Sequence, residues 1–145
     1  MRMKKIKIKL IEGGTKPEYK TKGACCADCY ARLEAPFITI PEGKRCLVNL
    51  GFAVELPKGY EAVVRPRSGN SKKGIDIAIG TIDFDFRGEI KACVINNTEG
   101  DLDIHNGERI CQLKIQKAEQ FKFHVVDTLS KTARGEKGFG STDSM

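Results

Sequence analysis

Short runs in which apolar and polar residues alternate constrain this chain more than any other feature. A period of two places successive side chains on opposite faces of an extended strand. The alternation appears in "RCLVNL", "IDIAI" and "ICQLKI", and turn sequences such as "LPKG" and "HNGE" separate the runs. No long window keeps the 3.6-residue period of a helix. The sequence therefore predicts an all-β domain, barrel or jelly-roll-like, with at most one short helix, at "SGNSKKG".

The alternation also assigns an apolar face to each expected strand. These faces consist of Ile6, Ile8 and Leu10; Cys46, Val48 and Leu50; Ile75, Ile77 and Ile79; Cys111, Leu113 and Ile115; and Phe121, Phe123 and Val125. After Val126 the apolar pattern stops. We therefore expect a β domain over residues 1–126 and a flexible carboxyl-terminal tail over residues 127–145.

Charge and hydropathy narrow the classes of partner. A net charge of +6 favours anionic partners such as nucleic acids, membrane surfaces or polyanionic small molecules. Nucleic acid is not expected, because the positive charges are dispersed and no strand combines aromatic with basic residues. No apolar run approaches the ~20 residues of a membrane span. The basic start lacks the apolar stretch of a signal peptide, which indicates a cytoplasmic protein with reduced thiols.

The six cysteines are expected to be structural. Cys26 and Cys29 form a C-x-x-C pair, but a structural zinc site needs a second pair at similar spacing, and the sequence has none. Cys46 and Cys111 fall in alternating runs, where a cysteine is a small core residue. A metal or redox role for these thiols is therefore not expected.

The segment "RPRSGNS" at residues 65–71 carries groups that suit phosphate oxygens. Arg67 offers a guanidinium fork, Ser68 a hydroxyl, and Gly69 a backbone that a ligand can approach closely. The same residues also describe an ordinary exposed turn, so this segment alone leaves both interpretations open.

The segment "GTIDFDFRGEI" at residues 80–90 combines carboxylates with aromatic rings. A turn between Asp83 and Gly88 would bring Asp83 and Phe86 into one pocket. There the carboxylate can orient a water molecule while the ring stacks on a sugar or base. Taken alone, the segment fits better a hairpin whose acids are solvated and whose phenylalanine lies in the core.

The end of the chain, "RGEKGFGSTD" at residues 134–143, has the glycine spacing of a phosphate loop. Ser141 stands where such a loop requires lysine, no strand leads in and no helix follows, so a nucleoside-triphosphatase P-loop is excluded. Its amides, its hydroxyls and Arg134 can still wrap a polyphosphate. A disordered tail explains the glycines but not the Arg, Phe, Ser and Thr beside them.

Taken together, five segments in fixed order resemble the motifs of the trimeric dUTP nucleotidohydrolase (dUTPase) family. They are "GACCADCYA" from Gly23, "PRSG" at 66–69, "GTIDFDFRGEIK" at 80–91, "GERICQL" at 107–113 and "RGEKGFGSTD" at 134–143. The chain departs from the family where Cys25, Cys26 and Cys29 replace the usual Ala, Gly and Leu of the first motif. In the third motif Phe86 stands where the family usually has tyrosine. Asn70 and Ser71 replace a Leu-Ala pair after the second motif.

The resemblance implies a compact β-clip barrel that hydrolyses dUTP to dUMP and pyrophosphate. Water would attack the α-phosphate with Asp83 as general base, and Asp28 would meet a Mg²⁺ ion through water. Phosphates would be held by Arg67, Ser68, Gly69, Gln112, Arg134, Gly140, Ser141 and Thr142, and the nucleoside by Ile79, Gly80, Ile82, Phe86 and Phe139.

The resemblance also implies a homotrimer whose sites lie between subunits. The fifth motif of one chain would close as a lid over a site formed by two others. This explains why the chain ends on a segment that nothing in its own fold supports. The alternative that stays open is a dUTP-sensing regulatory binding protein of the same fold.

Overall fold

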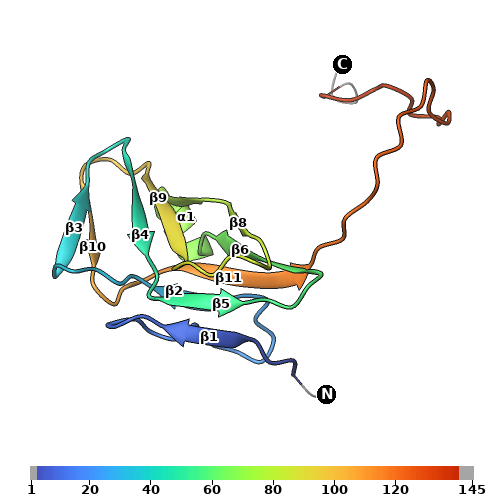
Figure 1. Cartoon of the computed structure of the whole chain (residues 1–145). Coiled ribbons are helices and arrows are strands. Elements are labelled where there is room, and N and C mark those ends of the chain that lie inside the picture. The colour runs from blue at the N-terminus through green and yellow to red at the C-terminus, as the bar shows by residue number, and fades with distance from the viewer. Residues whose placement is uncertain (1–2, 141–145) are drawn as a thin grey trace.

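The computed structural model describes residues 3–140, and within them every regular element except one short helix is a β-strand (Figure 1). The elements are β1 (Lys7–Leu10), β2 (Ala27–Tyr30), β3 (Phe37–Ile40), β4 (Arg45–Asn49), β5 (Phe52–Glu55), β6 (Tyr60–Arg65), α1 (Ser68–Lys73), β7 (Ile75–Ala78), β8 (Gly80–Ile82), β9 (Lys91–Asn96), β10 (Leu102–His105) and β11 (Arg109–Lys117). The all-β class expected from the alternation is confirmed.

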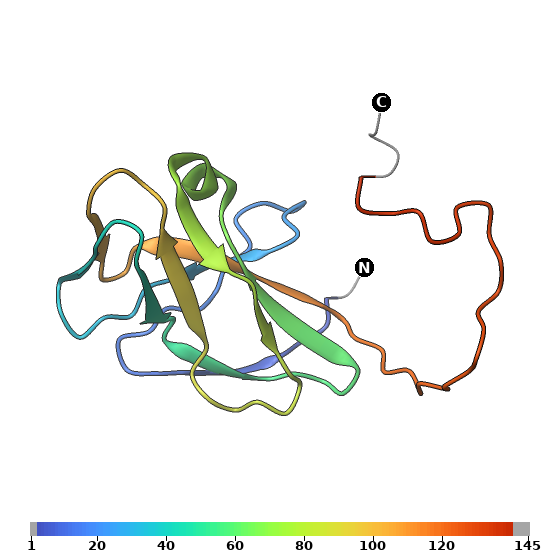
Figure 2. The same ribbon diagram turned by 90° about the horizontal axis from the view of Figure 1, so that it is seen from above.

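Within residues 3–140 the strands form four antiparallel sheets: β1–β5, β3–β10, β4–β9–β7 and β2–β11–β6–β8. Figures 1 and 2 show the sheets wrapped around one body, with the β3–β10 pair at the end far from the carboxyl terminus. The longest strand, β11, pairs with β2 along one part of its length and with β6 along another. This central position of β11 decides which sequence segments become neighbours.

One continuous apolar core fills the body. Phe52, Leu50 and Val48 are almost completely buried, and burial of each side chain of this size contributes about 1.5–3 kcal/mol. The alternation assigned most faces correctly, but Leu10 is 50% exposed and Ile79 is 71% exposed. Leu10 lies on a two-stranded sheet at the margin of the body. Ile79 is exposed because β7 ends at Ala78, and the chain turns there before β8 begins.

The helical turn expected at residues 68–74 is confirmed as α1. Arg67 precedes it with an extended backbone, and Gly74 closes it with φ of 92°. In this left-handed conformation the Gly74 N–H donates to the carbonyl groups of Asn70 and Ser71, a role that favours glycine. Because α1 follows β6 after only two residues, the "PRSG" segment is fixed at the end of a sheet strand.

The prediction of a strand at "FKFHVV" is wrong. β11 ends at Lys117, and residues 121–126 form no strand. Phe121, Phe123 and Val125 are 74%, 94% and 92% exposed. A period of two shows that a segment can form a strand with one apolar face, but a strand also needs an edge to pair with. Within one chain this segment extends away from every edge.

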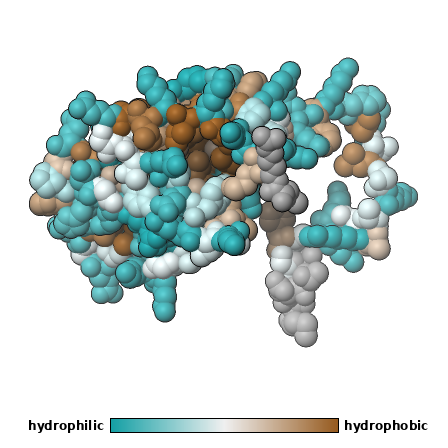
Figure 3. Space-filling view, turned by 90° about the horizontal axis from the view of Figure 1, so that it is seen from below, coloured by the Kyte–Doolittle hydropathy of each residue, from teal (hydrophilic) through white to brown (hydrophobic). Residues whose placement is uncertain are grey.

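We call residues 3–117 the body and residues 118–140 the arm. The arm forms no helix or strand. Its first residues contact the body, because the N–H of Ala118 donates to the carbonyl oxygen of Gly59 at 2.9 Å and residues 118–120 line a hollow with residues 58–61 and 83–85. Beyond them it stands apart from the body in both ribbon views and in the space-filling view (Figures 1–3). A domain boundary at residue 126 stays a prediction. No helix in the described residues has the length and apolar character to cross a membrane.

Candidate active site

The order of strands in the largest sheet brings distant sequence segments together. β2 carries Asp28, β11 carries Arg109 and Gln112, and β6 leads into the "PRSG" segment. Gln112 lies opposite Asp28 on one side and opposite Arg65 on the other. The fourth strand, β8, pairs with β6 and leads into Asp83. Four of the five motifs therefore line one sheet, although they are far apart in the sequence.

Asp28 lies between two arginines. Its carboxylate is 3.1 Å from Nη1 of Arg109 and 3.9 Å from Nε of Arg67, and the Asp28 side chain is only 14% exposed. Arg67 also donates through Nη1 to the carbonyl oxygen of Arg109, at 3.2 Å. These contacts hold the guanidinium groups in defined orientations, which favours recognition of an anion by a fixed fork of donors.

The first of two hollows, which we call the Gln112 hollow, has a volume of about 940 Å³. It is lined by Cys26, Arg65, Pro66, Ser68, Ser71, Lys72, Asp76, Ile77, Ile79 and Gln112. Gln112 is held in place because its Nε2 donates to the carbonyl oxygen of Pro66, at 2.9 Å. Two cations, two hydroxyl groups and the Gln112 amide outweigh the one carboxylate, Asp76, and give this hollow the chemistry of a phosphate site.

The second hollow, which we call the Asp83 hollow, has a volume of about 360 Å³. Its lining includes Gly80, Ile82, Asp83 and Phe86. The N–H of Phe86 donates to the carbonyl oxygen of Asp83, at 3.1 Å, and this turn brings the carboxylate and the ring to one hollow, as expected. The alternative, with Phe86 in the core, is wrong because the side chain is 46% exposed.

The ring of Phe86 lies against Gly88. A Cβ atom at Gly88 would stand 2.6 Å from the tip of the ring, so a larger residue would displace it. Ile79 lines the Gln112 hollow and Gly80 lines the Asp83 hollow, so the β7–β8 turn stands at the border between the two. Gly69 lies in α1, and a Cβ atom added there would meet no other atom within 4 Å.

The residues of the arm do not reach either hollow in a single chain. Phe139 is fully exposed, and its φ of 51° is the only positive value of a non-glycine residue in the described part of the chain. Arg134 donates through Nε to the carbonyl oxygen of Lys137, at 2.7 Å, within the arm itself. Gly140 ends the described residues with φ of 81°. Ser141 and Thr142 lie outside them.

Pattern reasoning missed one charged residue of this site, Arg109, which contacts Asp28. Its position inside the "GERICQL" segment was visible, but its partner depended on the pairing of β11 with β2. Residues 3–140 contain no cluster of three His, Cys, Asp or Glu side chains suited to a metal ion. Among these residues, two carboxylates lie beside the proposed phosphate-binding groups: Asp28, which pairs with Arg67 and Arg109, and Asp76, which lines the Gln112 hollow.

Comparison with known proteins gives consistent matches along the chain. A family model described as dUTPase matches residues 14–143. The deoxyuridine 5'-triphosphate nucleotidohydrolase of Treponema denticola is 49% identical over 92% of this chain and 94% of its own length. The protein of the same name from Orientia tsutsugamushi is 44% identical and covers 95% of this chain and 97% of its own length.

Solved structures resemble the fold closely. The dUTPase of Staphylococcus bacteriophage 80alpha with dUPNHPP has a TM-score of 0.88 and 25% identity, over 96% of this chain and 98% of its own. That study describes phage dUTPases as controlling the transfer of virulence genes. A variant dUTPase of phage phi11 of S. aureus, described with a structural Mg(II) ion, has a TM-score of 0.79 at 20% identity over 86% and 98%.

Proposed function

This chain belongs to the dUTPase family, and from that premise we propose how its residues hydrolyse dUTP to dUMP and pyrophosphate. It is an enzyme of nucleotide metabolism, a dUTP diphosphatase. The observation that carries the proposal is the strand order β2–β11–β6–β8, because it gathers four of the five motifs on one sheet, with one hollow at Asp83 and another at Gln112. The roles given to single residues below are our proposal.

Asp83 acts as the general base. Attack on an α-phosphate is slow because the phosphate oxyanions repel a nucleophile, so the site must neutralise charge and aim a water molecule. Asp83 accepts the proton of that water as the new phosphorus–oxygen bond forms, and pyrophosphate departs. Its position at the start of the loop after β8, in the same hollow as Phe86, supports this role.

Arg67, Ser68, Gly69 and Gln112 bind the phosphate chain. Arg67 presents its guanidinium beside Asp28, and Ser68 and Gln112 line the same hollow. Arg67 and Gln112 are held by hydrogen bonds before substrate arrives, so these two donors need little reorganisation when charge develops on the phosphate oxygens.

Mg²⁺ is the proposed cofactor, and Asp28 is the residue that meets it. Mg²⁺ usually keeps several waters and is held by one or two carboxylates plus substrate phosphates. The donor set fits that mode, because the Asp28 carboxylate lies beside Arg67, one of the groups proposed to bind phosphate. When bound, the ion supplies neutralisation of phosphate charge.

The β7–β8 turn recognises the uracil base, and Phe86 contacts the sugar. Backbone groups of Ile79 and Gly80, with Ile82 beside them, bind uracil, and a tight fit at C5 excludes the methyl group of thymine by steric clash. Phe86 covers the deoxyribose and leaves no room for a 2′-hydroxyl. Its ring lies over Gly88, where the missing Cβ leaves room for it, and this position supports a steric role.

The active form is a homotrimer in which the arm of one chain closes over a site built by two others. Phe139 lies over the uracil ring, while Arg134, Gly140, Ser141 and Thr142 reach the phosphates. The exposed apolar residues of the arm support this arrangement, because single chains rarely leave such a run uncovered. A cytoplasmic location stays a prediction.

The test is pyrophosphate release from dUTP, dCTP, dTTP and UTP, each with added Mg²⁺. We expect that, of these four nucleotides, only dUTP is hydrolysed at a substantial rate. Turnover of UTP comparable to that of dUTP would show that Phe86 does not exclude the ribose. The alternative, a regulatory sensor, predicts a protein partner whose affinity changes when dUTP binds, and the bacteriophage relatives make that measurement worthwhile.

A further inference from the structure

The loop that begins with Asp83 is fixed at its far end by a largely buried ion pair. This loop, residues 83–90, connects β8 to β9. Nε and Nη2 of Arg32 each donate to a different oxygen of the Glu89 carboxylate, both at 2.8 Å. The backbone N–H of Gly51 donates to the same carboxylate at 2.9 Å. The two side chains are only 16% and 14% exposed, so solvent screens this contact little.

The other partners of the ion pair belong to the rigid part of the body. The backbone N–H of Arg32 donates to the carbonyl oxygen of Asn49, at 2.8 Å. The stem of Arg32 runs across Gly51, where a Cβ atom would stand 3.3 Å from the stem and 2.4 Å from the backbone of Gly14. Gly51 also has φ of 79°, so a glycine is required there for the stem to lie in place.

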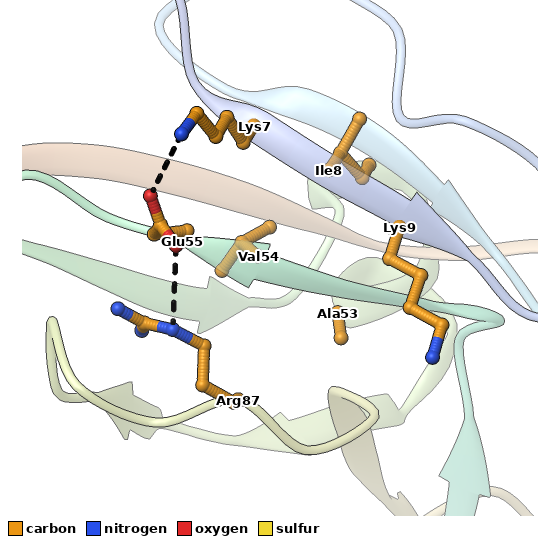
Figure 4. Close-up of a pocket in the computed structure, with 7 residues that line it drawn as sticks. All are labelled: Lys7, Ile8, Lys9, Ala53, Val54, Glu55 and Arg87. Atoms are coloured by element: carbon orange, nitrogen blue, oxygen red, sulfur yellow. Dashed lines mark ion pairs between the residues drawn. The ribbon is translucent and has the colours of Figure 1, made fainter.

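A second ion pair holds the same loop, but weakly. Arg87 is 3.8 Å from Glu55, which also pairs with Lys7 at 3.4 Å, and Figure 4 shows Glu55 between these two cations. The three side chains are at least 50% exposed, and exposed pairs contribute little. The Arg32–Glu89 pair is bidentate and shielded, so it dominates the placement of the loop.

Glu89 lies close to the proposed base, Asp83, but has no role of its own in the reaction. Its side chain lines the Asp83 hollow together with Asp83 and Phe86. Both of its carboxylate oxygens are already engaged by Arg32 and Gly51, and the Arg32 guanidinium keeps the pKa of Glu89 below its ordinary value. Glu89 therefore stays charged and bound to Arg32 instead of acting as a second base.

We propose that the Arg32–Glu89 ion pair is a positioning device for Asp83. It ties the loop that carries Asp83 to the segment that follows β2 and to Gly51. It thereby sets the position of the base relative to the rigid part of the body. This inference rests on the proposed role of Asp83. A displacement of about 1 Å at a reacting group can cost roughly 10²-fold in rate, so a remote contact of this kind can control turnover.

The pair should affect turnover more than binding. The β7–β8 turn and the Gln112 hollow are held by the sheet and not by the loop, so contacts to uracil and phosphate persist when the loop shifts, and Phe86 is the one proposed substrate contact that moves with Asp83. Loss of the ion pair should therefore lower kcat much more than it raises KM. A role limited to stability would lower the melting temperature and leave kcat unchanged in the folded enzyme.

The experiment compares the variants Arg32→Gln, Arg32→Lys and Glu89→Gln with wild type in the full chain. The quantities are kcat and KM for dUTP, affinity for the analogue dUPNHPP, and melting temperature. We expect Arg32→Gln and Glu89→Gln to lose about 10–100-fold in kcat, with KM and analogue affinity within about threefold. Arg32→Lys keeps one charged donor and should recover part of the rate.

Two controls make the outcome decisive. Ile104→Val in β10 removes a buried methyl group far from the loop, so it lowers the melting temperature and keeps kcat. Glu55→Gln removes the exposed pair and should change kcat less than twofold.

If Asp83→Asn is inactive while both Arg32→Gln and Glu89→Gln keep wild-type kcat, the positioning role is overturned and the proposed function stands. If Asp83→Asn itself keeps turnover, the base assignment fails and the positioning role fails with it.

If Arg32→Gln does not fold, Glu89→Gln carries the test under the same criterion. It keeps the shape of the side chain and an oxygen that can accept from Gly51.

Discussion

The body and the arm differ in whether their functional side chains are held in place within a single chain. In the body, Asp28, Arg67 and Gln112 are held by ion pairs and hydrogen bonds before any ligand arrives. In the arm, Phe121, Phe123 and Phe139 are exposed, and no strand pairs with the chain. A single chain therefore holds the functional groups of the body in position. The arm carries residue types suited to binding, but nothing in its own chain positions them.

The difference indicates where the missing interactions of the arm come from. A segment with exposed apolar residues loses conformational entropy on ordering and needs buried surface to offset that loss. In this structure the body of the same chain leaves Phe121, Phe123 and Phe139 exposed. A second chain is therefore the natural source, which agrees with the proposed trimer. The predictions below test this division between a preorganised body and a dependent arm.

The largest expected effect comes from the body. Asp83→Asn should keep the fold and dUTP binding but lower kcat by about 10²–10⁴-fold, the usual range for a positioned base. Steady-state kinetics and analogue binding measure both properties. Turnover at the wild-type rate would exclude Asp83 as the base and would move the chemistry elsewhere in the body.

Deletion of residues 133–145 tests the arm as a lid. The melting temperature should change little, because the described part of this segment buries almost nothing in the chain. Turnover should fall by at least about 10²–10³-fold, because several phosphate donors and the closure that excludes water are lost together. Affinity for dUTP should fall less than turnover. A collapse of the melting temperature would instead identify the segment as a structural arm.

A smaller effect is expected from the apolar side of the arm. The double variant Phe121→Ser and Phe123→Ser should weaken the trimer, because these rings are the surface that a second chain would cover. Light scattering at micromolar concentration should show a larger fraction of the 16.0 kDa monomer than in wild type. The matched control is Lys122→Ser with His124→Ser, which changes the alternate, polar positions and should leave the mass unchanged. Wild type that is monomeric at this concentration would contradict the trimer.

The smallest effect concerns acid stability of the body. The pKa of Glu89 is lowered, chiefly by Arg32, so the folded state favours the charged carboxylate. Its contribution to stability is complete above the ordinary glutamate pKa of 4.5 and is lost as pH falls through the lower folded value. The melting temperature of wild type should therefore exceed that of Glu89→Gln near neutral pH, and the gap should close in acid. A gap that stays constant with pH would mean that the charge of Glu89 is not responsible.

The sequence predicted much of the candidate site because several functional groups depend on local geometry. The turn that joins Asp83 to Phe86 spans four residues, and α1 is closed by Gly74 directly after it, so both were visible in short windows. The contacts of Arg109 with Asp28 and of Arg32 with Glu89 could not be predicted from the sequence. They join residues that are distant in sequence, and only the pairing of strands brings them together.

The sequence by itself determined the class of the fold, the positions of most strands and the order of the five motifs. Alternation fixes which side chains share a face, because consecutive residues of a strand point to opposite sides. It carries no information on which strand pairs with which. The tertiary structure decided that β11 lies between β2 and β6, that Ile79 turns outward, and that residues 121–126 remain unpaired. The physical reason is that a strand exists only when an edge is available, and edges are created by closure of the whole body.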